Sequence, residues 1–150
     1  MQQMLGISAS PIFLPYALTC VILNLNLLGL WIYGGVMRVK SKVATNAEDG
    51  ALQRVPVSDV DPPAVARVLR SHRNAEATII PFLFLGLLDV LAGGQVSIAL
   101  PIFVIFILSR IAHSAIYLGA KQPWRTIAFA VSLLATFALM LGAMQAMLTK

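Results

Sequence analysis

The sequence contains one cysteine and few charged side chains, and each shortage excludes a class of protein. Cys20 alone cannot form an intrachain disulfide, and a single thiol cannot build a thiolate metal cluster, so we expect no metal site and a packing role for Cys20. Only 11% of the 150 residues are charged, against about 25% in soluble domains. Hydrophobic residues make up 59% of the chain, and the mean hydropathy is +0.84. The composition therefore excludes an ordinary soluble domain and predicts an integral membrane protein.

Four long apolar stretches are present, at residues 7–37, 75–92, 96–119 and 124–148. Each approaches or exceeds the roughly 20 residues that an α-helix needs to cross about 30 Å of hydrocarbon. The first stretch has no basic segment before it and no small-residue cleavage site after it, so we read it as a span and not as a signal peptide. Short links at residues 93–95 and 120–123 require antiparallel neighbours. The sequence predicts an all-α, four-helix transmembrane bundle that forms a single domain over residues 1–150.

A polar connection at residues 38–66 separates the first two spans. The Pro62-Pro63 pair predicts the start of the second helix, with Asp61 as a candidate N-cap. Every lysine and arginine except Lys150 falls on the side of the bundle that holds this connection. The positive-inside rule places residues 38–66 and the link before the fourth span in the cytoplasm, with both termini on the opposite side.

The net charge of +5 raises the question of a nucleic-acid partner. The basic residues lie at the ends of apolar spans and not in a soluble module with interleaved aromatic residues, so we expect no nucleic-acid binding. Attraction to anionic headgroups of membrane lipids is an alternative explanation for Arg38, Lys40 and Lys42.

Polar side chains recur on one face of the second helix. At 100° per residue, Arg67, Arg70 and Asn74 share a face and Arg73 lies at its margin. His72 and Glu76, four residues apart, point to another side and can pair with each other. An ionisable group in or beside a span is costly and usually marks function. The alternative is a basic belt whose side chains extend to lipid phosphates.

A second polar stripe lies on the third helix, where Arg110, His113 and Tyr117 follow the i, i+3, i+7 pattern. His113 could instead orient a neighbouring group within the packing, and Tyr117 could be an interfacial anchor. The fourth helix begins with Arg125 and Thr126 in its first turn. Guanidinium groups bind carboxylates bidentately, and a cation at a helix N-terminus stabilises a thiolate. Because Cys20 lies mid-span, such a thiol would have to arrive with a ligand.

Three blocks, at residues 67–86, 110–119 and 122–126, together with Asn46-Ala-Glu-Asp49, resemble the MAPEG family of membrane-associated proteins in eicosanoid and glutathione metabolism. The resemblance implies a homotrimer of four-helix protomers that bind glutathione between adjacent subunits near the cytoplasmic face. It also implies a lipophilic substrate that enters from the membrane lipid. Transferred to this sequence, the glutathione site comprises Arg38, Arg70, Arg73, Asn74, Arg110, His113, Tyr117 and Arg125. Arg125 and Thr126 would stabilise the thiolate, and Asp49 would exchange a proton with Arg125.

The leading hypothesis is a glutathione-dependent membrane enzyme that acts on a lipophilic electrophile by conjugation, peroxide reduction or endoperoxide isomerisation. The alternative is a non-catalytic lipid-binding or scaffold protein of the same fold. A transporter is disfavoured because the polar groups cluster at one membrane face and do not line a path through the midplane. Apolar residues near the site are compatible with a substrate groove but are better explained by packing: Ile32, Tyr33, Phe82, Ile127 and Phe129.

Overall fold

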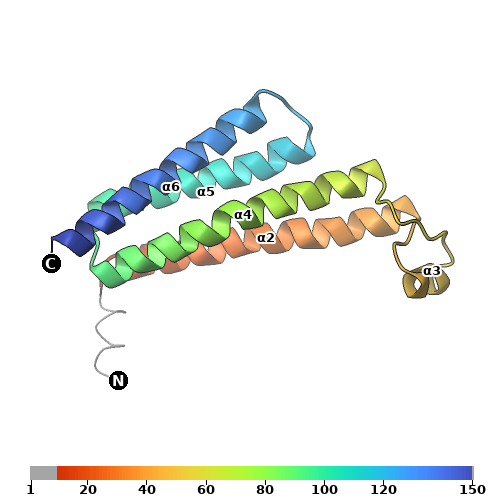
Figure 1. Ribbon diagram of the computed structural model, residues 1–150, viewed down its shortest axis with the longest axis horizontal. Helices are drawn as coiled ribbons and strands as arrows, with labels where there is room; N and C mark the ends of the chain where they lie inside the picture. Colours follow the sequence, from red (N-terminus) through yellow and green to blue (C-terminus); the bar gives the residue numbers. More distant parts are fainter. Residues whose placement is uncertain (1–9, 150) are drawn as a thin grey trace, which may run out of the picture.

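The computed structural model describes residues 10–149 and consists of five helices in that range. Four are long: α2 (Phe13–Ser41), α4 (Pro63–Ala92), α5 (Val96–Leu118) and α6 (Trp124–Leu148). They run side by side, while the short helix α3 (Ala47–Gln53) lies apart at one end (Figure 1). All four long helices have the length and apolar composition of membrane spans. The predicted all-α, multi-pass membrane fold is confirmed.

The first span is longer at its C-terminal end than predicted. Helix α2 continues to Ser41, so Arg38 and Lys40 occupy its last turn and are not part of the connection. Basic side chains are favourable there because the C-terminal end of a helix carries a partial negative charge. The connection is therefore residues 42–62, and it contains α3. Residues 7–9 of the predicted stretch lie outside the described range.

The prediction that Asp61 caps the second helix is wrong. Pro62 is the N-cap residue and Pro63 is the first helical residue, and no side chain caps this end. Asp61 lies one position too early to accept from the first backbone N–H groups of α4. Its carboxylate instead lies 3.4 Å from the guanidinium of Arg38. This ion pair joins the end of α2 to the start of α4.

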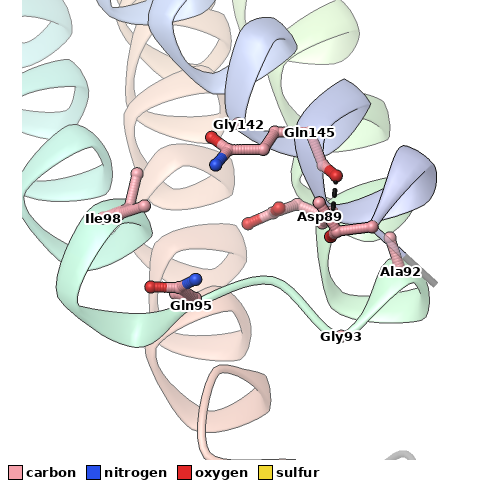
Figure 2. Close-up of a pocket in the computed structure, with 9 residues that line it drawn as sticks. Asp89, Ala92, Gly93, Gln95, Ile98, Gly142 and Gln145 are labelled. Atoms are coloured by element: carbon pink, nitrogen blue, oxygen red, sulfur yellow. Dashed lines mark hydrogen bonds between the residues drawn. The ribbon is translucent and has the colours of Figure 1, made fainter.

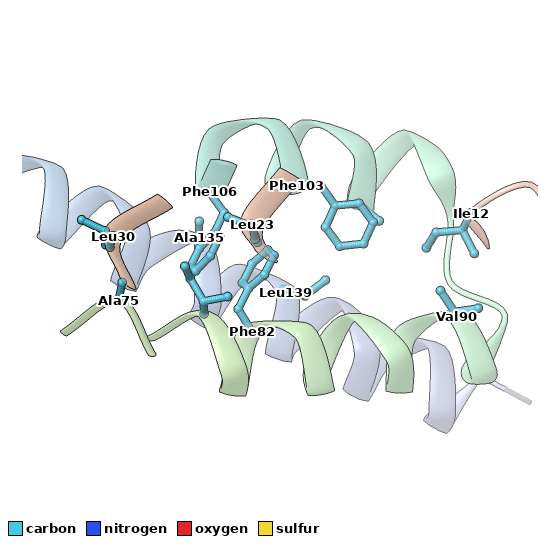
Figure 3. Close-up of a cluster of buried hydrophobic side chains, with 12 residues drawn as sticks. Ile12, Leu23, Leu30, Ala75, Phe82, Val90, Phe103, Phe106, Ala135 and Leu139 are labelled. Atoms are coloured by element: carbon cyan, nitrogen blue, oxygen red, sulfur yellow. The ribbon is translucent and has the colours of Figure 1, made fainter. Parts of the chain in front are cut away.

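The helices pack as two hairpins around a shared core. Helix α5 packs most extensively on α6, and α2 on α4. At mid-bundle, the rings of Phe82 and Phe106 stack with centroids 3.6 Å apart, and Phe103 meets Phe82 edge-on at 6.0 Å (Figure 3). These three rings, all buried, form what we call the aromatic layer. Phe82 therefore belongs to the core and not to a substrate groove. Many outward-facing side chains are apolar, as expected where a helix meets lipid.

The α4–α5 turn depends on glycine. Gly93 has φ 72°, a left-handed conformation that glycine adopts without the penalty of a Cβ atom. The N–H of Gly94 donates to the carbonyl of Asp89 at 2.8 Å. The link from Ala92 to Val96 and the link from Leu118 to Trp124 are both short, so each joins antiparallel neighbours as predicted.

Candidate functional site

A cavity of about 300 Å³ lies between α4, α5 and α6, at the end of the bundle that holds the α5–α6 connection. Its lining combines side chains from three separate stretches of sequence: Asn74, His113, Tyr117, Arg125, Thr126 and Phe129. Five of these six were predicted as site residues, and the sixth was assigned to packing or a groove. The structure therefore brings together most of the polar residues that the helical spacing singled out.

Arg110 links α4 and α5 beside this cavity. Its side chain is completely buried, and one terminal nitrogen donates to Asn74 Oδ1 at 3.0 Å. The other terminal nitrogen and Nε have no hydrogen-bond partner among the described residues. A buried cation with unpaired donors is costly unless an anion or further acceptors meet it. The guanidinium is thus suited to binding a carboxylate.

His113 lies one helical turn from Arg110 and is also buried. Its ring centroid is 5.6 Å from that of Tyr117 and 6.3 Å from that of Phe129. Within the described residues, its Nδ1 atom has no hydrogen-bond partner. The two aromatic rings fix the orientation of the imidazole while leaving one nitrogen able to meet a polar ligand atom.

Arg125 lies in the first turn of α6 and covers the ring of Tyr117, with Cζ 4.8 Å from the ring centroid. This distance is within the range of a cation–π interaction. The amide oxygen of Gln122 accepts from Arg125 Nε at 3.1 Å, and its amide nitrogen donates to Thr126 Oγ1 at 3.1 Å. Gln122 therefore positions both residues that were predicted to stabilise a thiolate. Its spacing of three and four residues from them was the signal in the sequence, but no role was assigned to it.

The other predicted site residues lie away from this cavity. Arg70 and Arg73 are exposed on α4, and Asp49 is exposed on α3. Arg38 donates to Thr45 Oγ1 at 3.0 Å in addition to its ion pair with Asp61. Among the described residues, Asp49 forms no ion pair with Arg125, and the role assigned to it stays a prediction.

A larger cavity, of about 830 Å³, lies between α2 and α4 and is mostly apolar. Trp31, Ile32, Val36 and Leu69 form its apolar wall, and Arg38 and His72 lie at its edge. His72 Nδ1 is 3.5 Å from a carboxylate oxygen of Glu76, which confirms the predicted pair. We refer to this cavity as the α2–α4 groove.

The charge of the first cavity determines which ligands it can accept. Arg125 lines it, Arg110 lies behind Asn74, and no acidic side chain is among its lining residues. Arg125 and Thr126 also lie at the N-terminus of α6, where backbone N–H groups carry a partial positive charge. The cavity therefore favours an anion, and its geometry suits a ligand with a carboxylate near Arg110 and a second negative atom near Arg125.

Known proteins match this chain over most of its length. The profile of the MAPEG family matches residues 16–145. The chain is 32% identical to human prostaglandin E synthase over 127 residues, which is 84% of each chain, and 38% identical to the dog protein of that name over 79% of each. It is also 39% identical to mouse microsomal glutathione S-transferase 1 over 99 residues, or 63% of this chain and 64% of the other. With four apolar spans and a family match across nearly the whole described range, this chain belongs to the MAPEG family.

Proposed function

We propose that this protein is a glutathione-dependent membrane enzyme that directs the thiolate of glutathione at a lipophilic electrophile. The observation that carries the proposal is the cationic cavity, which Arg125 and Thr126 line from the first turn of α6. The buried Arg110 donates to Asn74, another residue of its lining. The names of its relatives, prostaglandin E synthase and microsomal glutathione S-transferase 1, point to the same chemistry.

The two ends of the cavity would bind different parts of glutathione. A carboxylate of glutathione would accept from the unpaired nitrogens of Arg110, and Asn74 and His113 would orient the peptide. The sulfur would lie near Arg125 and Thr126, where the guanidinium, the hydroxyl and the helix N-terminus favour the thiolate over the thiol. Fixed donors that already point at the sulfur stabilise developing charge more strongly than water does, because they need not reorganise.

The thiolate can act on an electrophile in three ways. Attack on an electron-poor carbon forms a C–S bond and expels the leaving group. Attack on a peroxide oxygen breaks the O–O bond and oxidises the sulfur, which a second glutathione reduces. In an endoperoxide isomerisation, sulfur attacks one oxygen, so that an S–O bond forms, the O–O bond breaks and the other oxygen takes up a proton. Removal of the C–H proton then forms a C=O bond, breaks the S–O bond and releases the thiolate. For this last step Asp49 and Arg125 would exchange the proton.

We further propose a homotrimer with the site completed by an adjacent subunit near the cytoplasmic face. Arg38, Arg70, Arg73 and Asp49 lie outside the cavity of a single protomer, so a neighbouring copy is needed to bring them to glutathione. The exposure of Arg70 and Arg73 on α4 is compatible with such an interface.

The ultraviolet absorption of bound glutathione tests the proposal. Purified protein in detergent should show the thiolate band at neutral pH, and Arg125→Ala should remove it while Arg125→Lys retains part of it. Lys121→Ala, which removes a charge from the exposed α5–α6 link, is the matched control and should leave the band unchanged. Turnover would then be measured with a chloronitrobenzene, a lipid hydroperoxide and a prostaglandin endoperoxide. Absence of a thiolate in the unmodified protein would contradict the proposal.

The α2–α4 groove supports a second candidate, a non-catalytic lipid-binding protein. Its volume of about 830 Å³ and its apolar wall suit an acyl chain. Such a protein would bind lipid without glutathione, would show no thiolate band, and would be inactive on all three substrates. The same measurements therefore separate the two candidates.

A further inference from the structure

A second polar cavity lies at the opposite end of the bundle, where α4 and α6 end and α5 begins (Figure 2). Its volume is about 350 Å³. Its polar lining comes from the ends of these helices and their cap residues: Asp89, Gln95, Gln145 and Thr149, together with the backbone of Gly93. The aromatic layer separates it from the cavity lined by Arg125 and Thr126, so the proposed enzyme chemistry does not use it.

The carboxylate of Asp89 is the central feature of this cavity. Asp89 is only 3% exposed, and in Figure 2 its side chain points into the space between Gln95 and Gln145. No lysine, arginine or histidine in the described range forms an ion pair with it. Burying a carboxylate without a counter-charge is costly, and an ionisable residue inside a span is normally retained for a function.

The turn after Asp89 is shaped around this side chain. A Cβ atom added to Gly94 would collide with the carboxylate of Asp89, so only glycine leaves room for it. The Gly94 N–H donates to the Asp89 carbonyl, which holds the turn against the helix. The carboxylate therefore lies directly against the α4–α5 link, at the edge of the cavity.

The surroundings of the carboxylate add further negative potential. Helices α4 and α6 end here and α5 begins here, so two of the three helix ends carry a partial negative charge and one a partial positive charge. Gln95 and Gln145 offer amide oxygens, which coordinate cations in proteins. An Asp near a helix C-terminus is unfavourable by itself, and a bound cation would reverse that effect.

We propose that this cavity binds a small cation of charge +1, either an alkali-metal ion or a primary ammonium group. One carboxylate with neutral oxygen ligands balances a single positive charge, whereas calcium sites usually combine several carboxylates. A water molecule occupies about 30 Å³ in the liquid, so a cavity of about 350 Å³ accommodates an ion with part of its hydration shell.

Thermal unfolding of the full-length protein in detergent tests this proposal at constant ionic strength. Sodium, potassium and methylammonium chlorides are compared with choline chloride, whose cation is bulky and has no N–H donor. At ten times the dissociation constant, the binding cation should raise the Tm by about 3–6 °C. Stabilisation by sodium or potassium alone identifies an alkali-ion site, and stabilisation by methylammonium alone identifies an ammonium site. Either result supports the proposal.

Asp89→Asn should remove the cation dependence and leave glutathione binding at the other end unchanged. Asp59→Asn, which removes one acid from the exposed connection, is the matched control and should keep the dependence. If Asp89→Asn does not fold, Gln145→Leu takes its place and should weaken the dependence severalfold. Equal Tm values in all four salts would mean that Asp89 is simply a neutral carboxylic acid and would overturn the proposal. An unchanged dependence in Asp89→Asn would overturn it as well.

Discussion

Replacing Arg110 by methionine should stabilise the protein without ligand and at the same time weaken glutathione binding. Arg110 is fully buried, and two of its three guanidinium nitrogens have no partner in the described chain. Each unmet hydrogen bond costs about 1–3 kcal/mol, so methionine removes a penalty of about 2–6 kcal/mol. It also deprives Asn74 Oδ1 of its donor, which costs about 1–3 kcal/mol. The net gain is about 1–3 kcal/mol, or a Tm increase of about 2–12 °C for a chain of this length.

The same substitution removes two charge-assisted hydrogen bonds to a glutathione carboxylate. Each bond contributes about 1.5–3 kcal/mol, so their loss should raise the dissociation constant for glutathione by roughly 10²–10⁴-fold. Differential scanning calorimetry in detergent measures the first effect, and titration calorimetry with glutathione measures the second. Lys121→Met, which removes one exposed positive charge, serves as the control for long-range electrostatics and should change neither quantity strongly.

The opposite signs of the two effects make this prediction easy to refute. A guanidinium that served only the structure would make Arg110→Met less stable, because its loss would remove a favourable contact. An unchanged affinity for glutathione would show that the ligand does not meet Arg110. Either result would refute the reasoning that assigns this residue to ligand binding.

Three further predictions concern the stability of the bundle, and thermal or chemical unfolding in detergent measures each. Gly86→Ala should destabilise the protein by about 1–3 kcal/mol, because the new Cβ would lie 2.9 Å from the ring of Tyr16, whose hydroxyl donates to the carbonyl of Leu83. Gly142→Ala is the control and should be nearly neutral, since its nearest neighbour would lie at 3.8 Å. Phe82→Ala should cost about 3–5 kcal/mol, since it opens a cavity in the aromatic layer, and a cost below 1 kcal/mol would contradict that packing. Asp61→Asn should cost less than about 1 kcal/mol, because its partner Arg38 is 42% exposed and water screens the pair.

The spans were predictable because apolar composition and length are local properties of the sequence. The same holds for the stripe of Arg110, His113 and Tyr117, since helical periodicity alone places these side chains on one face. Helix ends were less predictable. The sequence predicted that Arg38 begins a polar connection, but α2 continues past it, because a cation is favourable at a helix C-terminus. The ion pair of Arg38 with Asp61 depends on the fold and could not be predicted.

Contacts between distant helices could not be read from spacing. Nothing local indicates that Arg110 meets Asn74 across α4 and α5. Asp89 did give a signal in the sequence, since a lone acid in an apolar stretch is energetically costly and usually marks function. That signal was not used. Its unpaired state became visible only with the surroundings that three helices supply.

The stacked phenylalanines at mid-bundle have a consequence for the electrical behaviour of the membrane. The protein has a polar hollow at each end, one lined by Arg125 and the other by Asp89. A continuous water-filled path between them would let ions cross and dissipate the transmembrane potential. Phe82, Phe103 and Phe106 fill that path with tightly packed hydrocarbon, in which an unhydrated ion has no favourable place. The bundle can therefore hold charged groups at both surfaces and still insulate one compartment from the other.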